Sequence, residues 1–493
     1  MIEVLSVENM RESDKATIEK TGSKELMKKA GEAISRAFSP RGKVAIVCGT
    51  GNNAGDGFVV AGCLTERGIP VHIFLLEDKF SPDGEHFFNI AKEKGVSYSI
   101  FTPETDFSDF GTIVDCIFGT GFKGTPTGIY QVVINKINES PAFVVSADIN
   151  SGLSGDSGMG EVVVKSDLTV SIGSFKPGHF LNMAKDIMKE KVNCPIGIDA
   201  VYPPFYLLEA EDFKGVFSPR KNLSNKGDFG YVALVGGSAK YSGAVKLSNL
   251  ALSALRSGAG VVKLGVPEEI SHSVMPYILE STLFPLSSKN GNILFNEAEI
   301  SELTGNTKAV AIGMGIGVSE EIKAVITYLL KSYTGVLIID ADGLNTISES
   351  GISIKNCAPK LVLTPHLKEF SRLTDLSISE ISENPVECAK NFAKENGCII
   401  LLKGPCSVIT DGERVYLTDK GCAGMATAGS GDVLSGITAG LCGFEKDTLL
   451  AVACSAYING LSGEIAETKT NSFSMTAGDT VSAIPEAINH IIS

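Results

Sequence analysis

Three aspartates stand at or beside the ends of apolar runs, where their carboxylates could take part in proton transfer. Asp56 follows one such run, Asp115 lies within another and Asp148 ends a third, and each is followed by a turn of small residues. A single acid in this position is often only the cap of the next helix. Three of them beside two glycine-rich loops indicate a ligand site at the carboxyl edge of a sheet, with groups suited to acid–base chemistry.

The glycine-rich stretch "CGTGNNAGDGFVVAG" at 48–62 separates two apolar segments. The backbone N–H groups of such a loop, with the N-terminus of the following helix, can hold a phosphate. Asp56 would repel that anion unless it contacts another part of the ligand. The G-x-G-x-x-G fingerprint of dinucleotide dehydrogenases is not met, because Ala54 stands where its last glycine belongs. The amide oxygens of Asn52 and Asn53 suit a weakly hydrated monovalent cation as well as a ligand.

A second glycine-rich stretch, "TAGSGDVLSGITAGL" at 427–441, combines an anion-binding loop with an acid. Gly429, Gly431 and the N-terminus of the helix after them predict an anion hole, and Asp432 lies in the first turn of that helix. Such an acid could merely stabilise the helix dipole, but that role would need neither glycine. The pattern therefore favours a phosphate site with a carboxylate beside it.

The elements that must position the first group of acids alternate between strands and helices. Near-continuous apolar runs of strand length indicate strands buried on both faces of a parallel sheet. We expect helices over 6–38 and 57–68. The expected strands of this half are 43–48, 71–78, 112–119, 142–149 and 167–173.

A stretch rich in proline, glycine and charge at 195–225 predicts a domain boundary, which gives domains 1–210 and 211–493. A second alternating series follows, with a helix over 243–259 and a hairpin that turns on Asp411-Gly412. Its other expected strands lie within 231–238, 261–267, 308–317, 336–345, 360–366 and 398–405. The fold class is therefore α/β, with two three-layer α/β/α domains in series.

The composition excludes several classes of protein. The chain has 493 residues and a net charge of −14, which is unlike the basic surface of a nucleic-acid binder. Its eleven cysteines include no C-x-x-C pair, which favours a reducing compartment. We expect neither a leader peptide nor a bilayer-spanning run, and hence a cytoplasmic protein that binds no membrane. The six histidines include no H-E-x-x-H pair, so we expect no zinc site.

The loops "GTGNNAGDGFVVA", "DCIFGTGFKGT" and "SADINSG", with "MRESDK" near the start, resemble the NAD(P)H-hydrate epimerase domain over about residues 1–210. The resemblance implies a Rossmann-like fold and a potassium ion held by Asn53, Asp115 and Ser151. It implies that hydrated NAD(P)H is bound by Asn52, Asn53, Ala54, Gly55, Asp56, Gly119, Thr120, Gly121, Phe122, Lys123, Gly124, Thr125 and Asp148. Since the hydrate is a hemiaminal, its epimerisation needs proton transfer, and we expect Asp148 and Lys123 to be the acid–base pair. For Lys123, a solvated loop lysine is an equal alternative.

The motif "AGSGD", with "KLVLTPHLKEF", "LLKGPCSVI", "IDADGLN", "YSGAVKLS" and "AIGMGIG", resembles the ADP/ATP-dependent NAD(P)H-hydrate dehydratase of the ribokinase-like superfamily over about residues 215–493. The resemblance implies ADP or ATP as co-substrate with Mg²⁺, and Asp432 as the catalytic base. It assigns the hydrate to Ala244, Gly315, His366 and Asp432, and the nucleotide to Lys403, Gly404, Pro405, Cys406, Ser407 and Gly431. Met314, Leu367-Lys368 and Pro405 depart from the usual residues, and His366 could instead be a satisfied polar group.

These observations predict a bifunctional enzyme that repairs hydrated NAD(P)H, with an epimerase followed by a dehydratase. The resemblance also implies a homo-oligomer. Two alternatives stay open. One is a ribokinase-like small-molecule kinase with an accessory Rossmann-like binding domain, which would release a phosphorylated product. The other is a binding or scaffold role for the first domain, which loss of its three acids would favour, and all three are present.

Overall fold

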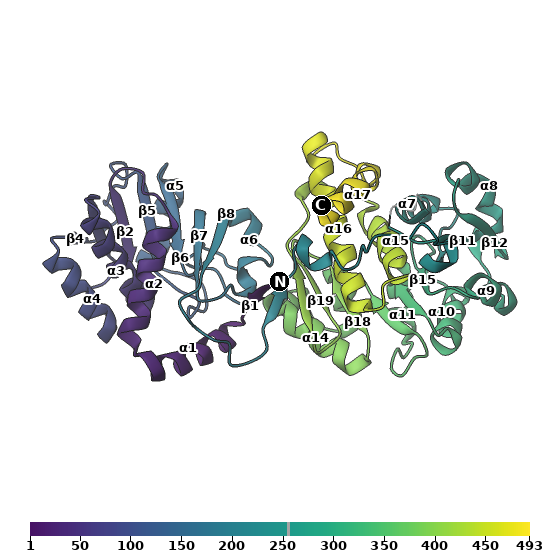
Figure 1. Cartoon of the computed structure of the whole chain (residues 1–493), viewed down its shortest axis with the longest axis horizontal. Coiled ribbons are helices and arrows are strands. Elements are labelled where there is room, and N and C mark those ends of the chain that lie inside the picture. Colours follow the sequence, from purple (N-terminus) through teal and green to yellow (C-terminus); the bar gives the residue numbers. More distant parts are fainter. Residues whose placement is uncertain (254–256) are drawn as a thin grey trace. The chain divides into compact units, whose positions relative to one another are not determined.

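The computed structural model of the chain describes residues 1–253 and 257–493, and these form two compact units. The first unit is Glu3–Phe205, and the second is Tyr206–Ser493 together with Met1–Ile2 (Figure 1). Both are α/β units. The predicted boundary at 210 lies close to this division, and as a boundary between functional domains it stays a prediction.

The first unit is built on a seven-stranded sheet in the order β4-β3-β2-β5-β6-β7-β8, with all strands parallel. The central strands are apolar and buried on both faces, as a parallel sheet covered by helices requires. The strands are β2 (Val44–Cys48), β3 (Val71–Leu75), β4 (Ser97–Ile100), β5 (Thr112–Cys116), β6 (Phe143–Ala147), β7 (Ser166–Ile172) and β8 (Met188–Cys194).

Two apolar clusters, one on each face of this sheet, make the unit three-layered. α2, α3 and α4 pack against one face, and α5 belongs to the cluster on the other. The Ser6 hydroxyl caps α1, and Gly22, with φ of 85°, separates α1 from α2. The helices are α1 (Val7–Thr21), α2 (Ser23–Ala37), α3 (Asn52–Glu66), α4 (Pro82–Glu93), α5 (Ile129–Glu139) and α6 (Ala184–Ile187), and η1 (Pro177–His179) is a single 3₁₀ turn.

The second unit contains a larger sheet in the order β9-β20-β19-β18-β17-β16-β15-β10-β11-β12. Its strands pair in parallel except around β19, which pairs antiparallel with both of its neighbours, β18 and β20. Its strands are β10 (Tyr231–Val235), β11 (Val261–Pro267), β12 (Thr282–Leu286), β15 (Ala309–Ile312), β16 (Val336–Ile339), β17 (Lys360–Leu363), β18 (Ile399–Leu402), β19 (Ser407–Thr410) and β20 (Val415–Thr418). β13 (Ser288–Lys289) and β14 (Asn292–Ile293) form a separate ribbon, and the short strands β1 (Ile2–Val4) and β9 (Phe205–Leu207) fall where the chain passes between the units.

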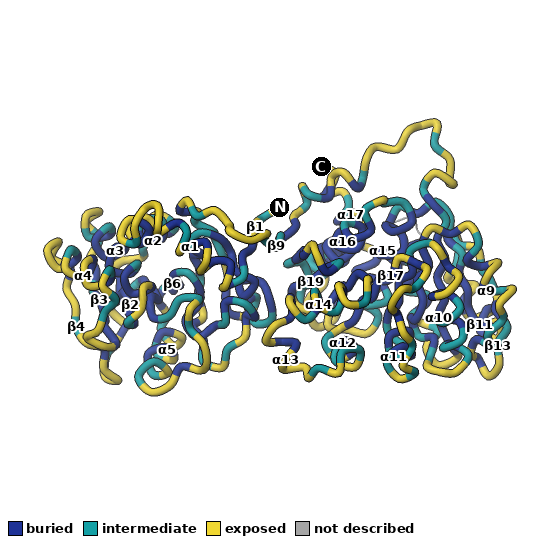
Figure 2. Tube along the Cα trace, turned by 90° about the horizontal axis from the view of Figure 1, so that it is seen from below, coloured by how far each residue is buried: buried dark blue, intermediate teal, exposed yellow. Residues whose placement is uncertain are grey.

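Helices cover both faces of this sheet as well. α7, α15, α16 and α17 pack on one another over one face, and α10, α11 and α14 lie on the other side (Figures 1 and 2). Figure 2 shows buried segments through the middle of each unit and exposed segments on outer helices and loops. The helices are α7 (Ser242–Ser253), α8 (Ser271–Val274), α9 (Glu297–Thr304), α10 (Glu320–Ser332), α11 (Asp342–Ser350), α12 (Leu367–Thr374), α13 (Ile378–Glu383), α14 (Pro385–Asn396), α15 (Ser430–Cys442), α16 (Thr448–Lys469) and α17 (Ala477–Ile492).

α16 is the one helix among the described residues that is long and apolar enough to cross a bilayer. Because 83% of its apolar window is buried inside the unit, it has the position of a core helix.

The α/β class and the predicted order of apolar strands are confirmed, with three differences in the elements. The edge strands β4, β8 and β12 were not predicted. α3 begins at Asn52 and not at 57, so the residues expected to form the end of the glycine loop are its first turns. α7 ends at Ser253, and the predicted helical residues 254–256 lie outside the described part of the chain.

Candidate active sites

The first candidate site lies at the carboxyl edge of the smaller sheet, between β2 and β5. The strand order reverses there, because β3 and β4 follow on one side of β2 while β5 to β8 follow on the other. Ligands of open α/β sheets bind in the crevice at such a point. A cavity of about 460 Å³ lies there, lined by α1, α2, the start of α3 and the turns after β5 and β6.

Close approach of two turns shapes this cavity. A β carbon at Gly49 would lie 2.2 Å from the carbonyl oxygen of Ile117, so a larger residue would force the turns after β2 and β5 apart. Thr50, Gly51 and Asn52 line the cavity at the N-terminus of α3, where free backbone N–H groups can face an anion.

Asp56 lies in α3, one turn beyond this N-terminus, and also lines the cavity. Burial, and then the nearby Asp148 and Asp14, raise its pKa well above the ordinary value of an aspartate. A raised pKa favours the neutral carboxyl, which repels a phosphate less than a carboxylate does.

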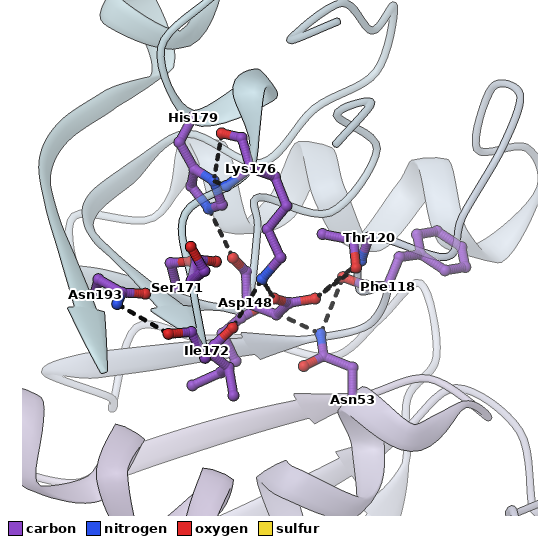
Figure 3. Close-up of polar contacts among 12 residues, drawn as sticks. Asn53, Phe118, Thr120, Asp148, Ser171, Ile172, Lys176, His179 and Asn193 are labelled. Atoms are coloured by element: carbon purple, nitrogen blue, oxygen red, sulfur yellow. Dashed lines mark hydrogen bonds and ion pairs between the residues drawn. The ribbon is translucent and has the colours of Figure 1, made fainter. Parts of the chain in front are cut away.

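Asp148 is held by donors from three directions (Figure 3). Its carboxylate lies 2.6 Å from the Lys176 ammonium, and the Thr120 backbone N–H and hydroxyl donate to it at 3.0 and 3.1 Å. Burial alone would raise the pKa of Asp148, but Lys176 and Thr120 outweigh it and hold the pKa below the usual range. Asp148 is therefore a carboxylate at neutral pH.

The backbone of Asp148 is held as firmly as its side chain. Its φ is 65°, a left-handed conformation that aspartate adopts at a cost. The His179 Nδ1 accepts the backbone N–H of Lys176 at 3.0 Å, so the proton of the neutral ring belongs on Nε2, which donates to the Asp148 carbonyl at 2.8 Å (Figure 3). Burial, and then Lys176, lower the pKa of His179 to about 4, so the ring is neutral in use.

Of the predicted epimerase residues, eight line the cavity: Asn52, Asn53, Asp56, Gly119, Thr120, Gly121, Phe122 and Asp148. As far as the described residues define its wall, Ala54, Gly55, Lys123, Gly124 and Thr125 are not part of it. Asp148 forms an ion pair with Lys176, and no hydrogen bond or ion pair joins it to the exposed Lys123 within the described chain, so the predicted acid–base pair of Asp148 and Lys123 stays a prediction. A catalytic role for Lys123 stays a prediction.

Asn53, Asp115 and Ser151 are brought together under the turn that follows β5. The Asn53 amide and the Ser151 hydroxyl both donate to the carbonyl of Phe118, at 2.9 and 3.3 Å. Ser151 reaches Asp115 through its hydroxyl at 2.5 Å and its backbone N–H at 2.9 Å. The buried Asn53 Oδ1 has no hydrogen-bond donor among the described residues. An orphan amide oxygen beside hydroxyl, carbonyl and carboxylate oxygens fits a monovalent cation.

The second candidate site surrounds the start of α15. Gly429 caps this helix with φ of 97°, and a β carbon there would lie 2.4 Å from a Leu247 methyl, so the turn requires glycine. Asp432 follows in the first turn. Burial, then the nearby Asp340, raise its pKa to about 7, while Lys403 opposes the shift. A carboxyl with this pKa can accept and release a proton at neutral pH.

A buried ion pair lies beside this loop. Lys403 and Asp340 are 2.8 Å apart, and the Ser435 hydroxyl donates to the other Asp340 oxygen at 2.6 Å. A β carbon at Gly431 would lie 3.5 Å from the Lys403 nitrogen, which places the pair against the glycine loop. The next residue, Ala341, has φ of 47° and ψ of −118°, a conformation that costs an L residue free energy.

The predicted hydrate residues gather around Asp432. A β carbon at Gly315 would lie 3.0 Å from the Ala244 methyl, and Ser248, one turn after Ala244 on α7, donates to the Asp432 carbonyl at 2.8 Å. His366 neighbours Lys403 through a bridge between their backbones. Its Nδ1 accepts from the backbone N–H groups of α12, so it does cap that helix, and its Nε2 lies 3.5 Å from the Glu369 carboxylate.

The predicted nucleotide residues extend from Lys403 to the start of β19. Gly404 and Pro405 are exposed, and the side chain of Cys406 is buried. Lys403 itself lies 3.9 Å from Glu369 as well as contacting Asp340. These assignments stay predictions, and the structure places Gly431 beside Lys403, the first of the five consecutive residues 403–407.

Four charged or polar residues of the sites were missed from sequence: Lys176, His179, Asp340 and Glu369. Lys176 and His179 belong to "FKPGH", which follows the end of an expected strand. Asp340 directly follows β16, as Asp148 follows β6. The same signal, an acid at the end of an apolar run, was therefore present in "IDADGLN".

Together, the two sites define an α/β enzyme with a buried aspartate–lysine pair and a glycine-rich loop in each of its two units. The larger unit has the ribokinase-like fold. It superposes on the ADP/ATP-dependent NAD(P)H-hydrate dehydratase of Bacillus subtilis, co-crystallised with ATP and Mg²⁺, with a TM-score of 0.51 and 26% identity over 58% of this chain and 98% of that one.

Sequence comparison gives the family. The family model described as NAD(P)H-hydrate dehydratase matches residues 232–486, and that of the YjeF-related protein N-terminus matches residues 23–178. Bifunctional NAD(P)H-hydrate repair enzymes Nnr are similar over nearly the whole chain: that of Thermofilum pendens is 33% identical over 99% of this chain and 96% of its own, and that of Archaeoglobus fulgidus is 35% identical over 94% and 93%. The chain belongs to the family of bifunctional NAD(P)H-hydrate repair enzymes, which confirms the predicted family.

Proposed function

We propose that the two reactions of this family are divided between the two units. The first unit epimerises the R and S forms of hydrated NAD(P)H, and the second dehydrates the S form to NAD(P)H with ADP or ATP as phosphate donor. The observation that carries this proposal is that relatives similar along both units are named for the joint activity. The two sites supply the groups that each reaction needs.

In the dehydratase, Asp432 is the base for the hydroxyl at C6 of the hydrate. It accepts the hydroxyl proton while the oxygen attacks the terminal phosphorus of the nucleotide, and the bond from that phosphorus to the bridging oxygen breaks, so that the nucleotide shortened by one phosphate leaves. The ring nitrogen's lone pair then breaks the C6–O bond and expels inorganic phosphate, and loss of the proton at C5 completes the dihydronicotinamide. The N–H groups at the start of α15 stabilise the transferred phosphoryl group, and Lys403 contributes a cation beside it.

In the epimerase, Asp148 and Lys176 form the charged group at the strand ends. The hydrate exchanges configuration at C6 through loss and return of its hydroxyl, so a proton must reach that oxygen and leave it again. Asp148 is a carboxylate placed to accept such a proton, and Lys176 and Thr120 hold it in position.

Two ions are proposed as cofactors. Asn53, Asp115 and Ser151 would hold K⁺, which would fix the turn after β5 and supply positive charge near the ligand. Mg²⁺ would accompany the nucleotide and neutralise part of its phosphate charge. If the K⁺ proposal holds, adding KCl at constant ionic strength raises the melting temperature of the wild-type chain more than choline chloride does, and Asn53→Ala abolishes the difference. Equal melting in both salts would contradict it.

The reaction itself is tested by incubating the full chain with R and S NADHX and ADP or ATP. We expect recovery of NADH absorbance with release of inorganic phosphate. A kinase with an accessory domain would instead accumulate a phosphorylated product without NADH, so the same reaction mixture separates the two functions.

The setting of the enzyme is also a proposal. We propose a cytoplasmic enzyme, which the eleven free cysteines support. A homo-oligomer rests on the family resemblance, and light scattering on the purified chain tests it.

A further inference from the structure

The cavity of the first unit receives a third acid from a separate element, the helix α1. Ser13 anchors this helix: its hydroxyl donates to the Asn9 carbonyl at 2.7 Å and accepts the backbone N–H of Val201 at 3.0 Å. Asn9 donates to the Tyr202 carbonyl at 3.0 Å. The next residue after Ser13, Asp14, is half-buried and lines the cavity.

Asp14 differs from Asp148 in having no partner in the protein. No residue within 1–253 or 257–493 makes a hydrogen bond or ion pair with the Asp14 carboxyl, whereas Asp148 has Lys176 and Thr120. A carboxyl that lines a cavity without a protein partner is free to contact a ligand.

The charges around Asp14 favour an exchangeable proton. Arg11, Asp56, Asp83, Asp148 and Lys176 line the same cavity. Burial raises the pKa of Asp14 to about 6, Lys176 lowers it and Asp148 raises it. At neutral pH, Asp148 is therefore ionised while Asp14 can still take up a proton, and two acids whose pKa values are held apart suit the two halves of a proton transfer.

Epimerisation at C6 needs such a division, because the hydroxyl leaves one face of the ring and water adds to the other. A proton transferred to the hydroxyl oxygen lets the C6–O bond break with its electron pair on the departing water, and the nitrogen lone pair forms the C6=N1 bond. Water then adds to C6 from the other face, the C6=N1 pair returns to nitrogen, and the added water gives up one proton. One water and one proton are used, and one of each is returned.

We propose that Asp14 is the second acid–base catalyst of the epimerase. It lies on the wall of the cavity formed by α1 and acts on the face of the nicotinamide ring opposite to the face on which Asp148 acts. Asp14 gives a proton to the hydroxyl, or takes one from water, on its face. On the other face Asp148, which is ionised before the reaction, takes the proton of the added water and returns that proton in the reverse reaction. This inference rests on the proposed epimerase activity.

The experiment uses the full chain with the variants Asp14→Asn and Asp14→Glu, and Glu12→Gln as matched control. Glu12 is an exposed acid on the same helix, outside the lining of the cavity. Each protein is given R or S NADHX in H₂¹⁸O without nucleotide, and mass spectrometry follows both the epimers and the ¹⁸O content of each. Thermal melting and circular dichroism of the same preparation, compared with those of the wild type, show that the first unit is folded, and dehydratase activity with S-NADHX and ATP shows that the second unit is intact.

We expect Asp14→Asn to epimerise about 10²–10⁴-fold more slowly, since that is the usual contribution of a general acid or base. One epimer alone should still take up ¹⁸O at nearly the wild-type rate, because Asp148 continues to remove and return water on its own face. Asp14→Glu should recover part of the rate, and Glu12→Gln should match the wild type.

Three results would overturn the inference. Epimerisation by Asp14→Asn within a factor of a few of the wild type would show that Asp14 is not a catalyst. Equal loss of epimerisation and of ¹⁸O uptake in both epimers would show that Asp14 only maintains the cavity. A wild-type chain that fails to epimerise would remove the proposed function, and the inference with it.

Discussion

The two units, built on sheets of different order, place the same three groups at their sites. Each has an aspartate at a strand end paired with a lysine, Asp148 with Lys176 at 2.6 Å and Asp340 with Lys403 at 2.8 Å. Each also has an unpaired acid on a helix whose pKa is raised into the neutral range, to about 6 for Asp14 and about 7 for Asp432.

The difference is which member of the pair is turned to the ligand. In the first unit the Lys176 side chain is 1% exposed and Asp148 is 17% exposed, whereas in the second Lys403 is 19% exposed and Asp340 is 2%. The first site therefore offers a carboxylate, and the second offers a cation beside the glycine loop of α15. The arrangement in the first unit supports proton exchange alone. The arrangement in the second unit adds the positive charge that stabilises a phosphoryl group. That distinction matches an isomerase on one side and a phosphate-driven lyase on the other.

The largest expected effect comes from removing the unpaired acid of the second site. Asp432→Asn keeps the shape of the residue but removes the proton acceptor, so the dehydratase rate should fall about 10²–10⁴-fold while epimerisation is unchanged. Nucleotide affinity should persist, because the N–H groups of α15 and Lys403 are intact. Glu320→Gln, in the first turn of α10, is the control for a simple helix-dipole effect and should leave turnover unchanged. Turnover of Asp432→Asn within a factor of a few of wild type would contradict the catalytic role.

Removing the lysine of each ion pair tests whether the buried member of the pair is the lysine in the first unit and the aspartate in the second. Lys403→Met leaves the buried Asp340 carboxylate without its cation and should lower the free energy of unfolding of the second unit by about 3–5 kcal/mol. Lys176→Met should cost less, about 1–3 kcal/mol, because Asp148 is more exposed and keeps its Thr120 donors. Urea unfolding of each variant measures both values. The double variant Asp340→Asn with Lys403→Met should recover part of the loss, and a larger cost for Lys176→Met would reverse the comparison.

The pH dependence of the two activities should also differ. The base Asp432 works when ionised, so kcat/KM of the dehydratase should rise with pH and level off above about 7, losing about tenfold per pH unit below it. Asp14, with a pKa of about 6, should place the corresponding change of the epimerase at lower pH. Profiles of both reactions on one preparation test this order. Profiles that change at the same pH for both reactions would contradict the difference in pKa between Asp14 and Asp432.

A smaller effect concerns stability. Because the folded chain holds the proton of Asp432 up to a pH of about 7, while the unfolded chain releases it near the ordinary value of 3.8, the contribution of this group to stability falls as pH rises between these values. Asp432→Asn should therefore raise the free energy of unfolding at pH 8 by on the order of 1–3 kcal/mol, and change little at pH 4. Thermal melts at both values measure the difference. Equal shifts at the two pH values would assign the effect to something other than ionisation.

The buried strands of both sheets were predictable, because a continuous apolar run is stable only where it is covered on both faces. The edge strands were not, since β4 ("SYSI") and β8 ("MKEKVNC") are partly exposed, and their polar side chains leave no continuous apolar run. The start of α3 was also misplaced. Its Asn-Asn-Ala-Gly-Asp run is a poor helix former, and packing against α2 and β2 overrides that local preference.

Individual site residues were predictable where a strand end and a small-residue turn adjoin, as for Asp148, Asp432 and the loop glycines. Their partners were not, because Lys176 reaches Asp148 across 28 residues and Lys403 reaches Asp340 across 63. Lys123 was chosen for its proximity in sequence to a glycine loop, and only the folded chain shows that its side chain lies outside the cavity. The sequence thus indicates which edge of a sheet carries the reactive side chains. The residue that forms an ion pair with each of them depends on the tertiary fold.

The burial of α16 has a consequence for how the chain is made. During synthesis the first unit is complete once Phe205 has emerged, whereas the sheet of the second lacks its core helix until residues 448–469 follow. The strands that contact α16, which are β18, β19 and β20, stay uncovered on one face until that helix has been made. The nascent second unit is therefore the part of this enzyme that most needs a chaperone.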